Sequence, residues 1–174
     1  MAKKEALREL QTRLAERLQA ARLQKTETAT WLAVECGGQG LLLPLGQAGE
    51  IFPLTALMPV PHTSAWFLGV ANLRGRLHGV VDLAVFLGLR AVPAPELGAQ
   101  SRLIAFNPAL EVNCALLVDR LAGLRSADQL RAVPDEAAHP AFAGTSYVDA
   151  GGRRWQEIVL AELAGEEAFL RIAR

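Results

Sequence analysis

The stretch from Trp66 to Leu89 limits the folds open to this chain more than any other segment. It contains two short apolar runs, 67–71 and 77–83, which have the length and composition of β-strands. Between them, the sequence Asn-Leu-Arg-Gly-Arg at 72–76 combines residues that tolerate positive φ with two long cations. The stretch therefore predicts a β-hairpin with a charged tip.

The hairpin is followed by signals for a short helix. Asp82 is predicted to be an N-cap, because a carboxylate accepts hydrogen bonds from the free N–H groups of a first helical turn. Residues 83–87 fit one such turn, and Gly88 can end it in a left-handed conformation. We expect a strand, a tight turn, a second strand and a capped helix in direct succession.

Short strand-like runs separated by turn residues recur along the rest of the chain. A hairpin is predicted at 31–45, and further strands are predicted at 102–106, 114–118 and 155–160. The two halves of the chain repeat a similar order of elements, in which a hairpin is followed by a long irregular connection and then by a strand. This spacing favours a mainly β fold of two small barrels packed side by side over a sandwich of long strands.

The organisation of the chain follows from the same patterns. Residues 1–25 place leucines at three- and four-residue spacing and predict an amphipathic helix, which either docks on its own domain or binds a partner. Residues 29–174 then form the main domain. We expect its first barrel at about 29–90, its second at about 100–163, and a helical tail at 161–174.

The charge and hydropathy patterns exclude several classes of protein. Eighteen Lys and Arg side chains balance eighteen Asp and Glu, so the chain lacks the overall positive field that nucleic acids and anionic membranes attract. No apolar run reaches the length of a membrane span, and the N-terminal charges interrupt any signal-peptide core. We expect a cytoplasmic protein that neither binds nucleic acid nor inserts into a membrane.

Few residues suggest catalytic chemistry. His62, His78 and His139 lack the spacing of a metal site, and no phosphate-binding or dinucleotide-binding loop follows a strand. We therefore expect no metal and no cofactor. Cys36 and Cys114 lie in apolar runs typical of buried thiols, although a pairing with His78 leaves a small cysteine-dependent hydrolase as an alternative.

Two charged residues, Glu50 and Arg74, each interrupt an apolar neighbourhood. They could form an ion pair that orients a binding edge beside the hairpin tip. They could equally be two solvated charges that contribute between zero and about 1 kcal/mol. The residues alone leave both interpretations open.

The run Gly69–Gly75, followed by Val80–Leu83 and Phe86–Leu89, closely resembles the signature of CheW-like chemotaxis coupling proteins. The resemblance spans about residues 29–163, and 67–77 is most similar to the PilI-type branch, which serves type IV pilus twitching motility. It implies two SH3-like five-stranded barrels, with strands possibly exchanged between them, and a few short helices. It also implies that the protein is not an enzyme.

The resemblance further implies an adaptor that joins the cytoplasmic tip of a methyl-accepting chemotaxis receptor to the regulatory domain of a CheA-type histidine kinase. A CheW-like scaffold with an output other than motility is a second possibility. The residues implied for receptor binding are Asn72, Leu73, Arg74 and Gly75, together with Glu50 as the ion-pair partner of Arg74. Those implied for kinase binding are Leu117, Val118 and Asp119.

Overall fold

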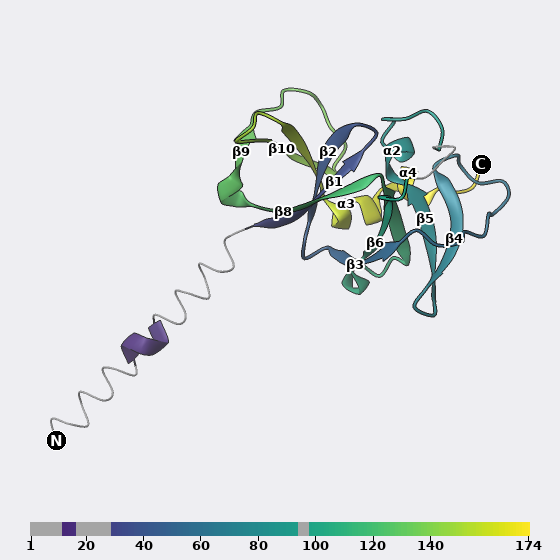
Figure 1. Ribbon diagram of the computed structural model, residues 1–174, viewed down its shortest axis with the longest axis horizontal. Coiled ribbons are helices and arrows are strands. Elements are labelled where there is room, and N and C mark those ends of the chain that lie inside the picture. The colour runs from purple at the N-terminus through teal and green to yellow at the C-terminus, as the bar shows by residue number, and fades with distance from the viewer. Residues whose placement is uncertain (1–11, 17–28, 94–97) are drawn as a thin grey trace, which may run out of the picture.

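The computed structural model describes residues 12–16, 29–93 and 98–174. Within them, two β-sheets lie side by side, and short helices pack beside their junction (Figure 1). The fold is mainly β, as predicted. The helix predicted at 1–25 lies outside the described residues except for 12–16, which are helical and exposed to solvent.

The strands have the following order in space. One sheet contains β8 (Arg120–Ser126), β1 (Thr30–Cys36), β2 (Gln39–Pro44), β11 (Arg154–Ile158), β10 (Ala143–Asp149) and β9 (Leu130–Val133). The other contains β3 (Ala48–Pro53), β6 (Arg102–Phe106), β7 (Cys114–Val118), β5 (Arg76–Asp82) and β4 (Phe67–Leu73). The short helices are α2 (Leu83–Phe86), η1 (Pro108–Leu110), η2 (Ala127–Gln129), α3 (Leu160–Gly165) and α4 (Glu167–Leu170).

Strands are exchanged between the two halves of the chain. The range 29–90 supplies β1 and β2 to one sheet and β3, β4 and β5 to the other, while 100–163 supplies the remaining strands of both. Two parallel pairings join the halves, β2 with β11 and β5 with β7. Because of this exchange, neither sheet is built from one continuous range of the chain. One sheet has six strands where five were expected.

The two barrels share a layer of buried side chains. On β1, Leu32 and Val34 belong to a cluster that also contains Ile104 and Leu116 of the other sheet. The alternate residues of β1, including Trp31, belong to a separate cluster within the six-stranded sheet. Both faces of β1 are therefore covered, which explains its almost uninterrupted apolar sequence.

The predicted hairpin is present, and a tight turn joins its strands. β4 and β5 are joined through Arg74 and Gly75, whose φ angles of 51° and 79° are both left-handed. The side-chain oxygen of Asn72 accepts a hydrogen bond of 2.8 Å from the Gly75 N–H. Asp82 caps α2 by accepting from the Val85 N–H at 3.2 Å, and Gly88 follows with a φ of 71°.

The segment before the hairpin is attached to the outer edge of β4. Met58 and Val70 exchange two backbone hydrogen bonds of 2.8 Å in an isolated antiparallel bridge. Gly69 permits this contact, because its φ is 133° and an added Cβ would lie 2.8 Å from the Met58 carbonyl carbon. The glycine of the hairpin motif is therefore required by a long-range backbone contact.

The C-terminal tail is partly helical. The helix-prone range 161–174 contains most of α3, a break at Glu166, and α4. Beyond α4, residues 172–174 run alongside 62–64 without helical structure. The helical tail expected over the whole range 161–174 is thus correct only to Leu170.

Candidate functional site

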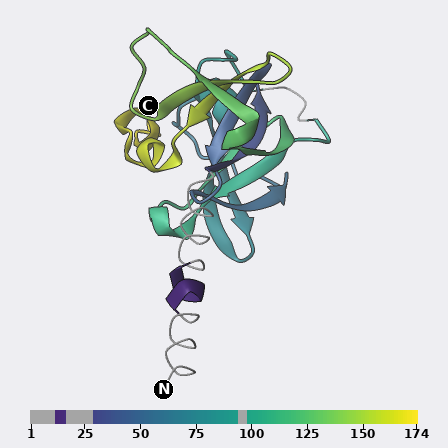
Figure 2. The ribbon, with the colours of Figure 1, turned by 90° about the vertical axis from the view of Figure 1, so that its left-hand side faces the viewer.

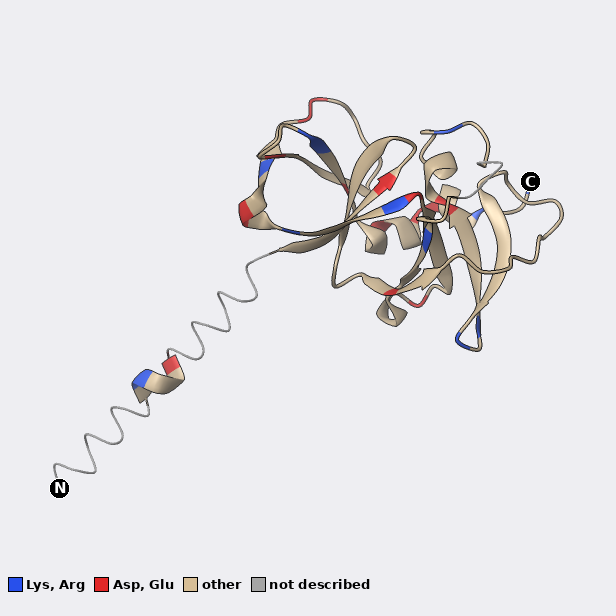
Figure 3. Ribbon diagram, viewed as in Figure 1, with Lys and Arg blue, Asp and Glu red and all other residues tan. Residues whose placement is uncertain are grey.

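The tip of the β4–β5 hairpin presents an ion pair at the protein surface. The Arg74 guanidinium lies 2.8 Å from a carboxylate oxygen of Glu50, and 76% of the Arg74 side chain remains exposed. Figure 3 shows basic residues at this tip, which extends beyond the body of the sheet. A pair this exposed adds at most about 1 kcal/mol to stability, so its main effect is to orient the guanidinium.

Arg74 occupies a backbone conformation that arginine rarely adopts. A two-residue turn of this kind normally carries Asn-Gly or Asp-Gly, because both central residues have positive φ. A larger L-residue in the left-handed region costs on the order of 1 kcal/mol. The chain therefore keeps a cation at the tip at some cost in stability, and strained backbone of this kind clusters at functional sites.

Two shallow grooves each include both residues of this ion pair in their lining. One, of about 350 Å³, is lined by residues including Ile51, Pro53 and Thr55. The other, of about 210 Å³, is lined by residues including Arg76 and His78. Shallow, mixed polar and apolar surfaces of this kind suit contact with another protein more than enclosure of a small molecule.

Two exposed residues near the tip were not singled out from the sequence. Leu77 is 65% exposed and lies directly opposite Asn72 in the hairpin. Arg76 is exposed as well, and no ion pair joins it to another described residue. The sequence signal for these residues was an apolar side chain beside two cations at a hairpin tip. The same pattern also occurs at strand ends that only face solvent, so it does not identify a binding residue.

The structure brings four of the five residues predicted for receptor binding to one surface. Asn72, Arg74 and Gly75 are exposed at the turn, and Glu50 reaches them from β3. Leu73 differs, because its side chain is buried in the core of the five-stranded barrel. Leu73 thus anchors the tip from inside and is not available as a contact residue.

The residues predicted for kinase binding require a larger correction. Leu117 and Val118 are buried on β7, one in the barrel interior and the other in the shared layer between the barrels. The uninterrupted apolar run of β7 was the signal for burial on both faces. A direct kinase contact by either side chain is incompatible with this fold.

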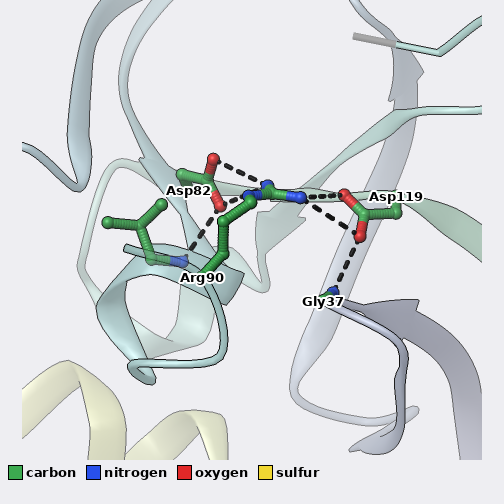
Figure 4. Close-up of polar contacts among 5 residues, drawn as sticks. Gly37, Asp82, Arg90 and Asp119 are labelled. Carbon is green, nitrogen blue, oxygen red and sulfur yellow. Dashed lines mark hydrogen bonds and ion pairs between the residues drawn. The ribbon is translucent and has the colours of Figure 1, made fainter. Parts of the chain in front are cut away.

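Asp119, the third of these residues, belongs to an internal network of charges (Figure 4). Its carboxylate accepts hydrogen bonds from the Gly37 N–H at 2.8 Å and from Arg90 at 3.1 Å. Arg90 also donates to both oxygens of the buried Asp82, at 3.0 and 2.9 Å. The network joins the end of β5 to the β1–β2 turn and therefore links the two barrels.

Arg90 is the residue of this network that sequence analysis missed. Burial by itself would lower the pKa of Arg90, but hydrogen bonds to Asp82 and Asp119 outweigh that effect and raise it. The guanidinium therefore remains charged and is shared between two carboxylates. Nothing in the local sequence around Arg90 signals this arrangement, because Asp119 lies 29 residues further along the chain.

Both cysteines lie in environments that suppress nucleophilic chemistry. Burial raises the pKa of Cys36 to about 12, and burial likewise raises the pKa of Cys114 to about 12. The thiolate, which is the nucleophile, is therefore a very minor form near neutral pH. These positions argue against the cysteine-dependent hydrolase that the sequence left open.

We expect thiol labelling to reflect this burial. At pH 8, Cys36 and Cys114 should react with a disulfide reagent about 1,000-fold more slowly in the native protein than in urea, because a pKa of about 12 replaces an ordinary value near 9. Absorbance of the released thiol measures the rate, and the urea sample, with both thiols accessible, is the control. Rapid labelling of either native thiol would contradict the buried assignment and favour the hydrolase.

The described residues contain neither a metal-binding cluster nor a membrane-spanning helix. Among residues 12–16, 29–93 and 98–174, no group of three or more His, Cys, Asp or Glu side chains is arranged to hold a metal ion. Within the same ranges, no helix is both long and apolar enough to cross a membrane.

Comparisons with known proteins give consistent matches. Residues 30–166 match the family model described as the CheW-like domain. The chain is 33% identical over 104 residues to "Protein PilI" of Pseudomonas aeruginosa, covering 59% of this chain and 56% of that protein. It is 37% identical over 60 residues to "Chemotaxis protein CheW" of Rhizobium meliloti, covering 34% and 39%. The matches thus span about half or less of the length of these curated relatives.

The fold also has a counterpart among solved structures. The crystal structure of scaffolding protein TtCheW from Thermoanaerobacter tengcongensis superposes with a TM-score of 0.62. The superposition covers 75% of this chain and 88% of that one, at 18% sequence identity. At this level of identity the likeness establishes the shared architecture of two small barrels and nothing about partners.

Proposed function

Since this chain belongs to the CheW-like domain family, we propose that it is a non-enzymatic adaptor of a chemosensory pathway in the cytoplasm. Residues 29–174 act as the CheW-like domain in this proposal. The adaptor couples a methyl-accepting chemotaxis receptor to the regulatory domain of a CheA-type histidine kinase. Signalling then depends on a difference in binding free energy between receptor states.

The observation that carries this proposal is the presentation of Arg74. Its guanidinium is exposed at the end of the β4–β5 hairpin, held in a left-handed turn and oriented by Glu50 at 2.8 Å. A preorganised cation of this kind loses little conformational entropy when it binds a partner. The Asn-Leu-Arg-Gly turn is therefore the part of the surface best suited to contact the receptor.

The proposed output is type IV pilus twitching motility. The resemblance of residues 67–77 to the PilI-type branch and the 33% identity with Protein PilI support this assignment. A different output for the same scaffold would keep the fold and change the partners. Loss of twitching after deletion of the encoding gene supports the pilus output, whereas unchanged twitching points to a different one.

Reversing the charge of Arg74 tests the receptor contact. We expect Arg74→Glu to weaken binding to the receptor's cytoplasmic hairpin at least tenfold, because the substitution removes the cation and places a carboxylate beside Glu50. Binding to the kinase regulatory domain should stay within twofold. Calorimetric titration with each purified partner measures both affinities.

The matched control is Arg131→Glu, which makes the same charge change at an exposed arginine of the other sheet. Failure of the wild-type protein to bind either partner would disprove the adaptor function. Equal receptor affinities of the two variants would place the receptor contact elsewhere on the molecule.

A further inference from the structure

The C-terminal tail makes a backbone connection to the segment that precedes the hairpin. Ser64 N–H donates to the Ile172 carbonyl at 2.8 Å, and Arg174 N–H donates to the His62 carbonyl at 3.0 Å. These bonds flank an isolated antiparallel bridge between Thr63 and Ala173. The end of the chain lies beside the short helices in Figure 2, so the tail reaches this segment directly from α4.

One buried aromatic residue fixes α4 itself. Phe169 is 4% exposed and stacks nearly parallel to Trp66 and Phe106, with ring centroids 6.2 and 5.8 Å away. Its ring also meets Phe86 edge to face at 5.3 Å. Trp66 ends the same segment that the tail bonds at 62–64, so two separate contacts hold that segment to the tail.

The other end of this segment is attached to the hairpin. Met58 bridges Val70 on the edge of β4, in the strand that leads to Arg74. The side chains between these attachments contribute little, since Met58 is 71% exposed and Val60 is also exposed. A segment with so few buried apolar contacts depends on its backbone hydrogen bonds for its position.

We propose that residues 166–174 act as a strap that holds segment 58–66 against β4 and thereby limits the motion of the receptor-binding hairpin. Releasing the strap frees the segment, weakens the Met58–Val70 bridge and leaves the edge of β4 unpaired. The effect on receptor affinity rests on the function proposed above, because a more mobile hairpin must be ordered upon binding. The effect on hairpin motion does not depend on that function.

Two variants of the full chain release the strap in different ways. Arg174→Pro removes the N–H donated to His62, and proline favours the extended conformation that the preceding residue already needs for its bridge. Phe169→Leu removes the aromatic stacking and keeps an apolar side chain. Leu170→Ala is the matched control, since Leu170 is the next residue of α4 and is 55% exposed.

Amide hydrogen exchange measured by mass spectrometry tests the strap in the isolated protein. We expect exchange at residues 58–73 to accelerate at least tenfold in both strap variants and to stay unchanged in Leu170→Ala. Exchange at 30–45, in the other sheet, should stay within twofold of the wild type. Unchanged exchange at 58–73, or an equal increase at 30–45, would overturn the proposal.

Titration with the receptor's cytoplasmic hairpin tests the consequence for binding. The strap variants should bind at least threefold more weakly than the wild type, and Leu170→Ala should bind equally well. If the wild type binds and the strap variants match its affinity, the strap does not regulate the site. If the wild type does not bind, the adaptor function fails, and hydrogen exchange still decides whether the strap exists.

Discussion

Replacing Asp82 with alanine is expected to lower the free energy of unfolding by about 3–5 kcal/mol. The carboxylate is fully buried and accepts two hydrogen bonds from Arg90 as well as one from the Val85 N–H. Its removal leaves a guanidinium that is only 23% exposed with a single remaining carboxylate, Asp119. Urea denaturation followed by tryptophan fluorescence measures the loss.

Two further variants separate the contributions of Asp82. Asp82→Asn keeps an N-cap oxygen and should be more stable than Asp82→Ala by about 1 kcal/mol, the usual value of a cap. In an Arg90→Met background, Asp82→Ala should lower the free energy of unfolding by less than in the wild type, because the guanidinium that would be left without this partner is already absent. A loss below about 1 kcal/mol for Asp82→Ala in the wild type would contradict a structural role for the network.

Gly69→Ala is expected to destabilise the protein by about 3–5 kcal/mol. A φ of 133° is costly for any residue with a side chain, and the added Cβ would lie against the Met58 backbone. Relieving that contact breaks the two hydrogen bonds between Met58 and Val70, each worth about 1 kcal/mol. Thermal and urea unfolding of the purified variant measure the loss.

Gly88→Ala isolates the effect of backbone conformation. Gly88 also has a left-handed φ, of 71°, but an added Cβ there meets no atom within 4 Å. This control should therefore lose only about 1–2 kcal/mol, the cost of the left-handed conformation. If the two variants lose the same stability, the contact between Gly69 and Met58 has no energetic importance.

The hairpin was predictable because its determinants lie close together in the chain. Asn72 bonds to a backbone group three residues away, and Asp82 caps a helix that starts at the next residue. Turn and cap preferences act over such distances regardless of the surrounding fold. The same local signals placed most of the other strands.

The candidate site was predicted in part. The ion pair between Glu50 and Arg74 was left open by the residues themselves and implied by the family resemblance, and the structure contains it. Leu73, Leu117 and Val118 lie in the stretches that carry the family resemblance, but their side chains are buried. A sequence motif does not distinguish residues that contact a partner from residues that pack in the core. The burial of each side chain does.

Local sequence patterns were enough to predict the short strands, the tight turn at 72–76 and the cap at Asp82. The folded chain was needed to see which strands pair, that Arg90 joins Asp82 to Asp119, and that Phe169 stacks on Trp66 and Phe106. The two groups of features differ in the range of the interactions behind them. Turns and caps are set by the conformational preferences of neighbouring residues, whereas strand exchange and charge burial depend on free energies summed over the whole folded chain.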